Sequence, residues 1–205
     1  MIFAHKSVLP FISGIKSITV STGFKDNLGN KGGIGITMLF GKTSFCFIAA
    51  HLAAGFTKVN RRVEEFERIS KEVAESLAYS PAEEVEAIAP SGDGQKRISA
   101  VRKGERNPLE RTFNYVFWFG DLNFRLHSTR LNVDKLLQSS QIANLILLDQ
   151  LTHYREFHPA FLGFSEGKIT FKPTYKFDVD CGKTQNLKNL AHRDHGLLFT
   201  FNISI

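Results

Sequence analysis

The sequence predicts an α/β fold, and three observations lead to that prediction. Residues 44–50 and residues 113–119 are almost continuously apolar, which is typical of strands buried on both faces. Between these two runs, residues 58–79 place apolar side chains every three or four positions, which indicates an amphipathic helix. Strands that are mixed with helices in this way favour a layered sandwich with the helices outside.

The N-terminal part of the chain is expected to supply further strands. Residues 1–20 contain short apolar stretches interrupted by a proline and a glycine, so they predict a strand, a loop and a second strand. The stretch 21–33 is rich in glycine and polar residues and predicts a loop. Residues 34–40 predict a strand, and a short turn leads from it into the apolar run 44–50.

The C-terminal half of the chain has weaker patterns. Residues 80–112 show no clear period and are punctuated by prolines, which predicts a long surface insertion. The other expected elements are one or two short helices over 132–148, a strand over 168–178 with a corner at Pro173, and a last strand over 197–205.

Charge and cysteine content narrow the possible partners and environments. The 205 residues carry 26 Lys and Arg against 20 Asp and Glu, and the charge of +6 favours anionic partners such as phosphates, acidic lipid surfaces or nucleic acid. Solubility alone also explains this excess and is the simpler interpretation. No apolar stretch is long enough to span a membrane. Cys46, expected in the core, and Cys181 offer no disulfide framework, which fits a reducing compartment such as the cytoplasm.

Three polar clusters stand where predicted strands begin or end, the usual place for ligands in layered α/β folds. In the first, small residues surround Lys31, whose ammonium suits a phosphate. In the second, His51 follows a buried strand and is suited to bind a phosphoryl oxygen or move a proton; a structural histidine is the simpler alternative. In the third, Asp121 and Asn123 follow the run 113–119 and share one face if the strand continues.

The third cluster has two equally supported interpretations. A carboxylate beside an amide is suited to orient and deprotonate a water molecule, but Asp and Asn also satisfy backbone groups in ordinary turns. Taken together, the clusters contain the groups that transfer of a phosphoryl group to water requires. An obvious pair of acidic metal ligands is missing.

Four segments in the same order resemble the signature motifs of inositol polyphosphate 5-phosphatases, which belong to the DNase I/exonuclease III-like superfamily. They are GNKGG (29–33), AAHLAAG (49–55), FWFGDLNFRL (117–126) and FKPTYKFD (171–178). The resemblance implies a partial four-layer α/β/β/α sandwich with a long surface insertion near 80–112. It also implies one incomplete catalytic domain over 1–205 with a divergent tail over 179–205.

The resemblance further implies a Mg²⁺-dependent hydrolase that removes the 5-phosphate from phosphoinositide lipids or soluble inositol polyphosphates. It implies that Asp121 is the base that activates water, that Asn123 positions the water or the phosphate, and that His51 binds the scissile phosphate. It also implies that Asn30 and Lys31 line the phosphate pocket, that Tyr175 and Lys176 contact the substrate, and that Arg125 supports the site. Residues 31, 51, 121 and 176 must then share one site.

Two departures from the family pattern bear on activity. Similar enzymes carry a metal-binding asparagine and glutamate on strands that precede the region matched here, and we expect these two ligands to be missing from residues 1–205. The P-x-W-C-D-R segment that follows PTYKFD in such enzymes is absent. Either Asp194 and His195 are remnants of a later Asp-His pair and candidate metal ligands, or residues 179–205 are an unrelated tail, which is the favoured interpretation. We therefore expect a fragment with weak or no hydrolysis.

Two alternatives remain open beside the 5-phosphatase. One is a phosphodiesterase or nuclease of the same superfamily, although Lys176 in its motif argues against it and no nucleic-acid partner is expected. The other is a non-catalytic phosphoinositide-binding remnant. Residues 8–12 lie where similar enzymes carry a lipid-recognition loop, so these apolar side chains either enter an acidic membrane surface or pack in the core. Peripheral association of a cytoplasmic protein with membranes is the corresponding expectation.

Overall fold

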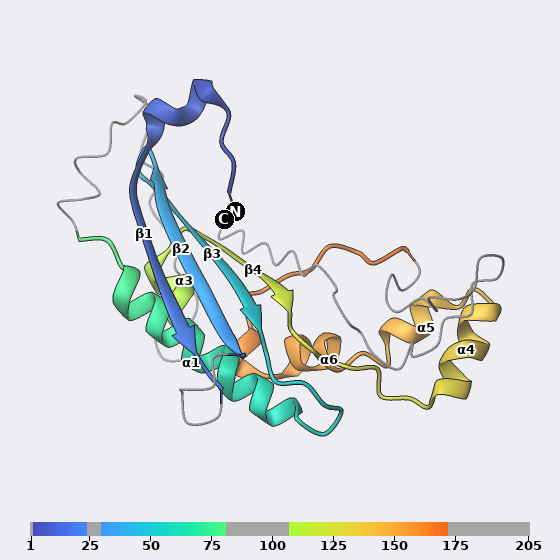
Figure 1. Ribbon diagram of the computed structural model, residues 1–205. Helices are drawn as coiled ribbons and strands as arrows, with labels where there is room; N and C mark the ends of the chain where they lie inside the picture. Colours follow the sequence, from blue (N-terminus) through green and yellow to red (C-terminus); the bar gives the residue numbers. More distant parts are fainter. Residues whose placement is uncertain (1, 24–29, 81–106, 172–205) are drawn as a thin grey trace.

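The computed structural model describes residues 2–23, 30–80 and 107–171 (Figure 1). Its strands are β1 (Ile12–Ser21), β2 (Gly32–Phe40), β3 (Thr43–His51) and β4 (Tyr115–Asp121). Its helices are α1 (Val59–Leu77), α3 (Pro108–Thr112), α4 (Arg130–Gln138), α5 (Ile142–Ile146) and α6 (Gln150–Phe157), with short 3₁₀ helices η1 (Lys6–Phe11) and η3 (Pro159–Phe161). None of the helices in these ranges is long and apolar enough to cross a bilayer.

The four strands form one sheet in the order β1-β2-β3-β4. β1, β2 and β3 are joined antiparallel in sequence, whereas β3 and β4 run parallel because the connection between them includes α1. Gly32 at the start of β2 pairs with His51, and His51 pairs with Asp121. The start of β2 and the ends of β3 and β4 therefore meet at one edge of the sheet.

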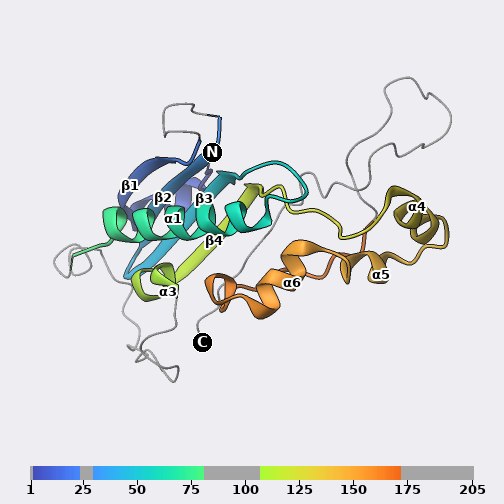
Figure 2. The same ribbon diagram turned by 90° about the horizontal axis from the view of Figure 1, so that it is seen from below.

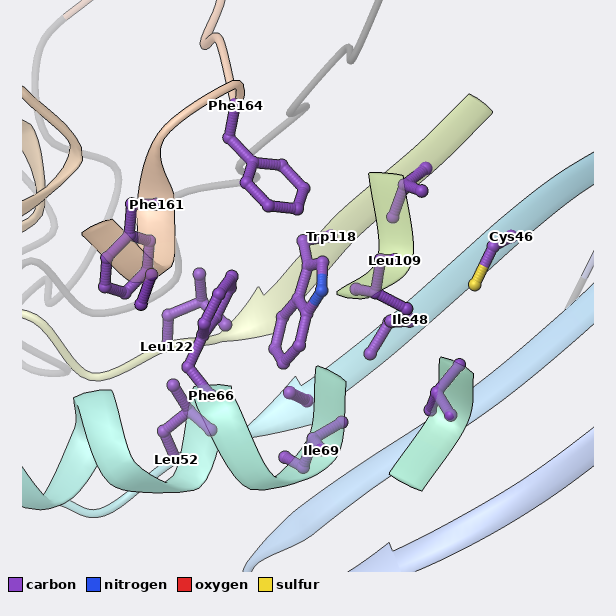
Figure 3. Close-up of a cluster of buried hydrophobic side chains, with 14 of the residues drawn as sticks. Cys46, Ile48, Leu52, Phe66, Ile69, Leu109, Trp118, Leu122, Phe161 and Phe164 are labelled. Carbon is purple, nitrogen blue, oxygen red and sulfur yellow. The ribbon is translucent and has the colours of Figure 1, made fainter. Parts of the chain in front are cut away.

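The main hydrophobic core lies between one face of the sheet and the helices α1 and α3 (Figure 2). The predicted amphipathic helix is confirmed: Phe66, Ile69 and Val73 on its apolar stripe are at most 2% exposed. Phe66 packs on Trp118 and on Phe161, with ring centroids 4.2 Å apart in both pairs (Figure 3). Aromatic side chains from α1, β4 and η3 thus join the core directly behind the end of β4.

The opposite face of β3 and β4 departs from the sequence prediction. Burial alternates along both strands, so the prediction that 44–50 and 113–119 are buried on both faces is wrong for the part of the chain that the structure describes. Phe45, Phe47 and Phe117 on this face are half-buried, and Phe47 stacks on Phe117 with ring centroids 4.9 Å apart. A continuous apolar run indicates that both faces of a strand are apolar, but it does not indicate whether other parts of the protein cover both faces.

Short elements account for most of the other differences. Residues 6–11 form a 3₁₀ helix where the sequence predicts a strand, and α6 has no counterpart among the predicted elements. The surface insertion predicted over 80–112 ends too late, because α3 lies inside it and Leu109 is fully buried in the core. A five-residue helix is too short to show a period; its sequence signal is the Asn107 cap followed by a proline.

The remaining strands and helices match the sequence patterns to different degrees. The strand predicted over 34–40 and the two short helices predicted over 132–148 are confirmed. The strand predicted from residue 168 is absent over 168–171, and its remaining residues, like those of the strand predicted over 197–205, lie outside the described ranges. α4 and α5 bury a small separate cluster around Val133 and extend away from the sheet (Figures 1 and 2).

Candidate active site

Three of the side chains that the sequence singles out meet at the edge of the sheet where β2 begins and where β3 and β4 end. Lys31 immediately precedes β2, His51 is the last residue of β3, and Asp121 is the last residue of β4. The Lys31 Nζ and His51 Nε2 atoms are 2.5 Å apart, and the same His51 nitrogen lies 3.2 Å from Asp121 Oδ2. Residues that are 20 and 70 positions apart in the chain thus form one continuous polar cluster.

Local backbone geometry explains how Asp121 reaches this position. Gly120 adopts φ +120, and a Cβ atom there would lie 2.2 Å from the Ala50 carbonyl oxygen of the neighbouring strand. Only glycine lets the two backbones approach so closely in this conformation. One residue later, the Leu52 amide donates to the Asp121 carbonyl at 3.0 Å, so the pairing continues past the end of the strands.

The three side chains of the cluster share one ring nitrogen of His51. A single ring nitrogen of His51 faces both the Lys31 ammonium and the Asp121 carboxylate, and it either accepts from the lysine or donates to the aspartate. The His51 side chain is 51% exposed and that of Asp121 is 19% exposed, so both groups are accessible from solvent. An anion bound to Lys31 frees the histidine N–H to donate to the carboxylate, which suits a phosphate ester.

Asn123 and Arg125 occupy the layer beneath this cluster. The strand ends at Asp121 and Asn123 has φ 57, so the alternation expected to put Asp121 and Asn123 on one face does not extend that far. The Asn123 amide donates to the Leu52 carbonyl at 2.9 Å, and its oxygen accepts from Arg125 Nη2 at 2.8 Å. Both side chains are about 5% exposed or less, and they connect the segments that follow β3 and β4.

Of the other predicted site residues, the structure describes only Asn30. Asn30 is exposed in the turn directly before Lys31. The predicted substrate residues Tyr175 and Lys176, and the candidate metal ligands Asp194 and His195, lie outside the described residues.

Several buried polar residues near the site are not among those that the sequence singles out, and one of them is Glu65, which accepts from the Ala53 N–H at 2.7 Å. Arg62 of α1 is fully buried, and Gln150 at the start of α6 is 8% exposed. The sequence contains a usable signal for the burial of Arg62, because Phe66 and Ile69, four and seven positions later, put it on the apolar face of the helix. Gln150 has none, since its burial depends on contacts with residues far away in the chain.

The groups at the site can be compared with what a divalent cation requires. Magnesium prefers an octahedral set of oxygen ligands, with carboxylates among them. Within the described ranges no three His, Cys, Asp or Glu side chains are grouped to hold a metal. The carboxylate of the cluster, Asp121, contacts His51, which also contacts the Lys31 ammonium. The described residues therefore do not by themselves supply a set of protein ligands for a magnesium ion.

Comparison with known proteins identifies the family. The family model described as endonuclease/exonuclease/phosphatase family 2 matches residues 1–189. The chain belongs to this family. Human synaptojanin-1 is 34% identical over 181 residues, which are 87% of this chain and 10% of that protein. The phosphatidylinositol 3,4,5-trisphosphate 5-phosphatase 2B of Danio rerio is 33% identical over 188 residues, 90% of this chain and 13% of that protein.

A solved structure supports the same assignment. The inositol polyphosphate 5-phosphatase domain of SPsynaptojanin, crystallised with inositol (1,4)-bisphosphate and a calcium ion, is 28% identical with a TM-score of 0.65. The match covers 96% of this chain and 48% of that one. The predicted α/β class and the resemblance to inositol polyphosphate 5-phosphatases are thereby confirmed. The chain spans about a tenth of the length of these curated relatives and about half of the solved domain.

Proposed function

We propose that this chain contributes the water-activating and phosphate-binding groups of an inositol polyphosphate 5-phosphatase. The observation that carries the proposal is the meeting of Lys31, His51 and Asp121 at one edge of the sheet, with a cation and a carboxylate facing the same imidazole nitrogen. The ligand in the related SPsynaptojanin structure, inositol (1,4)-bisphosphate, supports inositol phosphates as the substrate class. Phosphoinositide lipids and soluble inositol polyphosphates carry the same headgroup chemistry.

In the proposed reaction, a water oxygen forms a bond to phosphorus while the bond from phosphorus to the ring oxygen breaks. The water proton passes to the Asp121 carboxylate, and the ring oxygen gains a proton from solvent. Lys31 and His51 neutralise the charge on the phosphoryl oxygens. The Asn123 backbone N–H donates to Asp121 Oδ1 at 3.2 Å and so orients the carboxylate that acts as base.

Dependence on Mg²⁺ is part of the proposal. A bound divalent cation supplies Lewis-acid stabilisation of the phosphoryl oxygens in enzymes of this kind. The related solved domain was crystallised with a calcium ion, which supports a role for a divalent cation. Slow turnover is expected, because no three His, Cys, Asp or Glu side chains are grouped to hold such a cation among the described residues.

We also propose that η1 contacts an acidic membrane surface and that the protein is a cytoplasmic, peripheral membrane protein. No residue of η1 is buried, which disfavours the alternative that residues 8–12 pack in the core. Leu9 is 52% exposed and Phe3, just before the helix, is 86% exposed. Lys6 at the start of η1 adds a positive charge beside these apolar side chains, a combination that favours anionic lipid surfaces.

Phosphate release from inositol (1,4,5)-trisphosphate and from phosphatidylinositol 4,5-bisphosphate vesicles tests the catalytic proposal. Turnover is expected with Mg²⁺ and not with EDTA. Asp121→Asn is expected to lower kcat by about 10²–10⁴-fold, the usual contribution of a general base. Lys31→Gln is expected to weaken binding of inositol (1,4)-bisphosphate in calorimetry. Lys135→Gln, an exposed site on α4 away from the cluster, is the matched control.

Each outcome of this experiment has a defined meaning. Binding without metal-dependent phosphate release refutes catalysis and supports the non-catalytic binding protein. Cleavage of plasmid DNA without release from inositol phosphates refutes the substrate class and supports the phosphodiesterase. Equal binding by the Lys31 and Lys135 variants refutes the assignment of Lys31 to the phosphate.

A further inference from the structure

A buried arginine from the helix lies behind the candidate site. Arg62 of α1 is fully buried, and its Nη1 donates to the carbonyls of Ala53 at 3.1 Å and Gly55 at 2.7 Å. These two residues belong to the segment that follows His51. The guanidinium also lies over the Phe124 ring, 5.0 Å from its centroid. Burial and the charge of Arg125 lower the pKa of Arg62 to about 10, so it remains a cation at neutral pH.

The hydrogen bonds of Arg62 also connect to the segment that follows Asp121. Arg62 Nη2 donates to Gln150 Oε1 at 2.7 Å, and the same oxygen accepts from the Arg125 backbone N–H at 3.0 Å. The Gln150 N–H in turn donates to the Arg125 carbonyl at 2.9 Å. Arg125 reaches back to Asn123, whose amide donates to Leu52. The bonds therefore form a closed ring between the two segments.

We propose that Arg62 and Gln150 are positioning residues that hold His51 and Asp121 at a fixed separation. This inference rests on the proposed function, because it assigns the two residues a role in that reaction. The parallel ladder between β3 and β4 ends at the pair His51–Asp121, followed by one further bond from the Leu52 amide. Beyond that pair, the closed ring of hydrogen bonds holds the two segments together in place of strand pairing, because it joins residues 52–55 to residues 123–125.

The chemical nature of the residues argues against a purely packing role. Arg62 lies on the apolar face of α1, where a leucine or methionine would fill space without the cost of desolvating a charge. Its guanidinium donates to the segment after β3 and to Gln150, so one side chain joins α1 to two distant parts of the chain. A planar cation with several donors is suited to fix two segments at once.

The test compares kinetics in two backgrounds. Arg62→Lys keeps the charge but loses the planar fork, and it is expected to lower kcat about 10–100-fold, the effect of roughly 1 Å of misplacement, with KM changed less than about threefold. In the Asp121→Asn background the same substitution is expected to change kcat less than about threefold, because the base that it positions is already gone. Arg68→Lys, at a partly exposed position of the same helix where Arg68 pairs with Glu72, is the matched control.

A second pair of variants guards against a folding defect. Gln150→Glu keeps the acceptor for Arg62 Nη2 and for the Arg125 backbone N–H but, like Gln150→Met, loses the 3.3 Å donation from Nε2 to the Phe56 carbonyl, so it is expected to lose less kcat than Gln150→Met. Gln150→Met removes that acceptor and is expected to lose kcat as Arg62→Lys does. Urea unfolding followed by Trp118 fluorescence establishes that each variant is folded. Equal losses in both backgrounds, or equal kcat for the two Gln150 variants, overturn the proposal.

A readout without turnover separates this inference from the proposed function. If the unmodified chain releases no phosphate, the proposed function fails, and the imidazole NMR signals of His51, assigned through His51→Gln, decide the positioning role. A chemical-shift change in Arg62→Lys that is absent in Arg68→Lys supports it. Unchanged His51 signals in a folded Arg62→Lys variant refute it.

Discussion

Replacement of Gly120 by alanine tests how tightly the end of β4 is fixed. The new Cβ atom would lie 2.2 Å from the Ala50 carbonyl oxygen and 2.9 Å from the Ala50 nitrogen, both of them backbone atoms that cannot rotate away. To reach an ordinary contact, the two strands must separate by about 1 Å at the pair Ala50–Gly120. The backbone at φ +120 is strained for any residue with a side chain, whatever the space.

The expected loss of stability follows from these two terms. Strained backbone costs about 1–3 kcal/mol and overpacking about 1–3 kcal/mol, so a loss of about 3 kcal/mol in the free energy of unfolding is expected for Gly120→Ala. With a urea dependence of about 2 kcal/mol per M, the midpoint falls by about 1–2 M. Because Asp121 is the next residue, kcat is expected to fall about 100-fold as well.

Urea unfolding followed by the fluorescence of Trp118 measures this effect, since Trp118 is the one tryptophan of the chain and lies two residues before Gly120. Gly167→Ala is the matched control, because a Cβ atom there meets nothing within 4 Å, and its free energy of unfolding is expected to change by less than about 0.5 kcal/mol. An unchanged midpoint for Gly120→Ala refutes the reasoning about the close approach of β3 and β4.

Two further predictions concern the core and the membrane. Leu109→Ala is expected to lower the free energy of unfolding by about 2–5 kcal/mol, because the side chain is fully buried, whereas Leu131→Ala at a 66% exposed position should change it little; urea unfolding compares them. Leu9→Ser is expected to reduce binding to phosphatidylinositol 4,5-bisphosphate vesicles about tenfold in flotation assays, the loss of one inserted side chain. Equal flotation of Leu9→Ser and of the control Leu147→Ser, exposed between α5 and α6, contradicts the membrane contact of η1.

The groups suited to phosphate chemistry are recognisable in the sequence. Lys31, His51 and Asp121 each stand beside a strand with a distinct apolar pattern, and their places at the ends of these strands mark them as candidate ligand groups. The expectation that they share one site comes from the resemblance to inositol polyphosphate 5-phosphatases. The helix 58–79 and its buried stripe are equally legible, because a period of 3.6 residues sustained over five turns has no competing interpretation.

Tertiary structure alone decides how those groups are held. Whether Asn123 faces the substrate or the interior depends on where β4 ends and on one residue with positive φ, and a local pattern reports neither. The hydrogen bond between Arg62 and Gln150 joins residues 88 positions apart, so no local pattern predicts it. The helix α3 is too short for a sequence period to predict the burial of its leucine. Sequence patterns record which faces are apolar and which groups are reactive. The contacts that orient those groups arise only when distant segments pack, because each contact depends on the position of both partners.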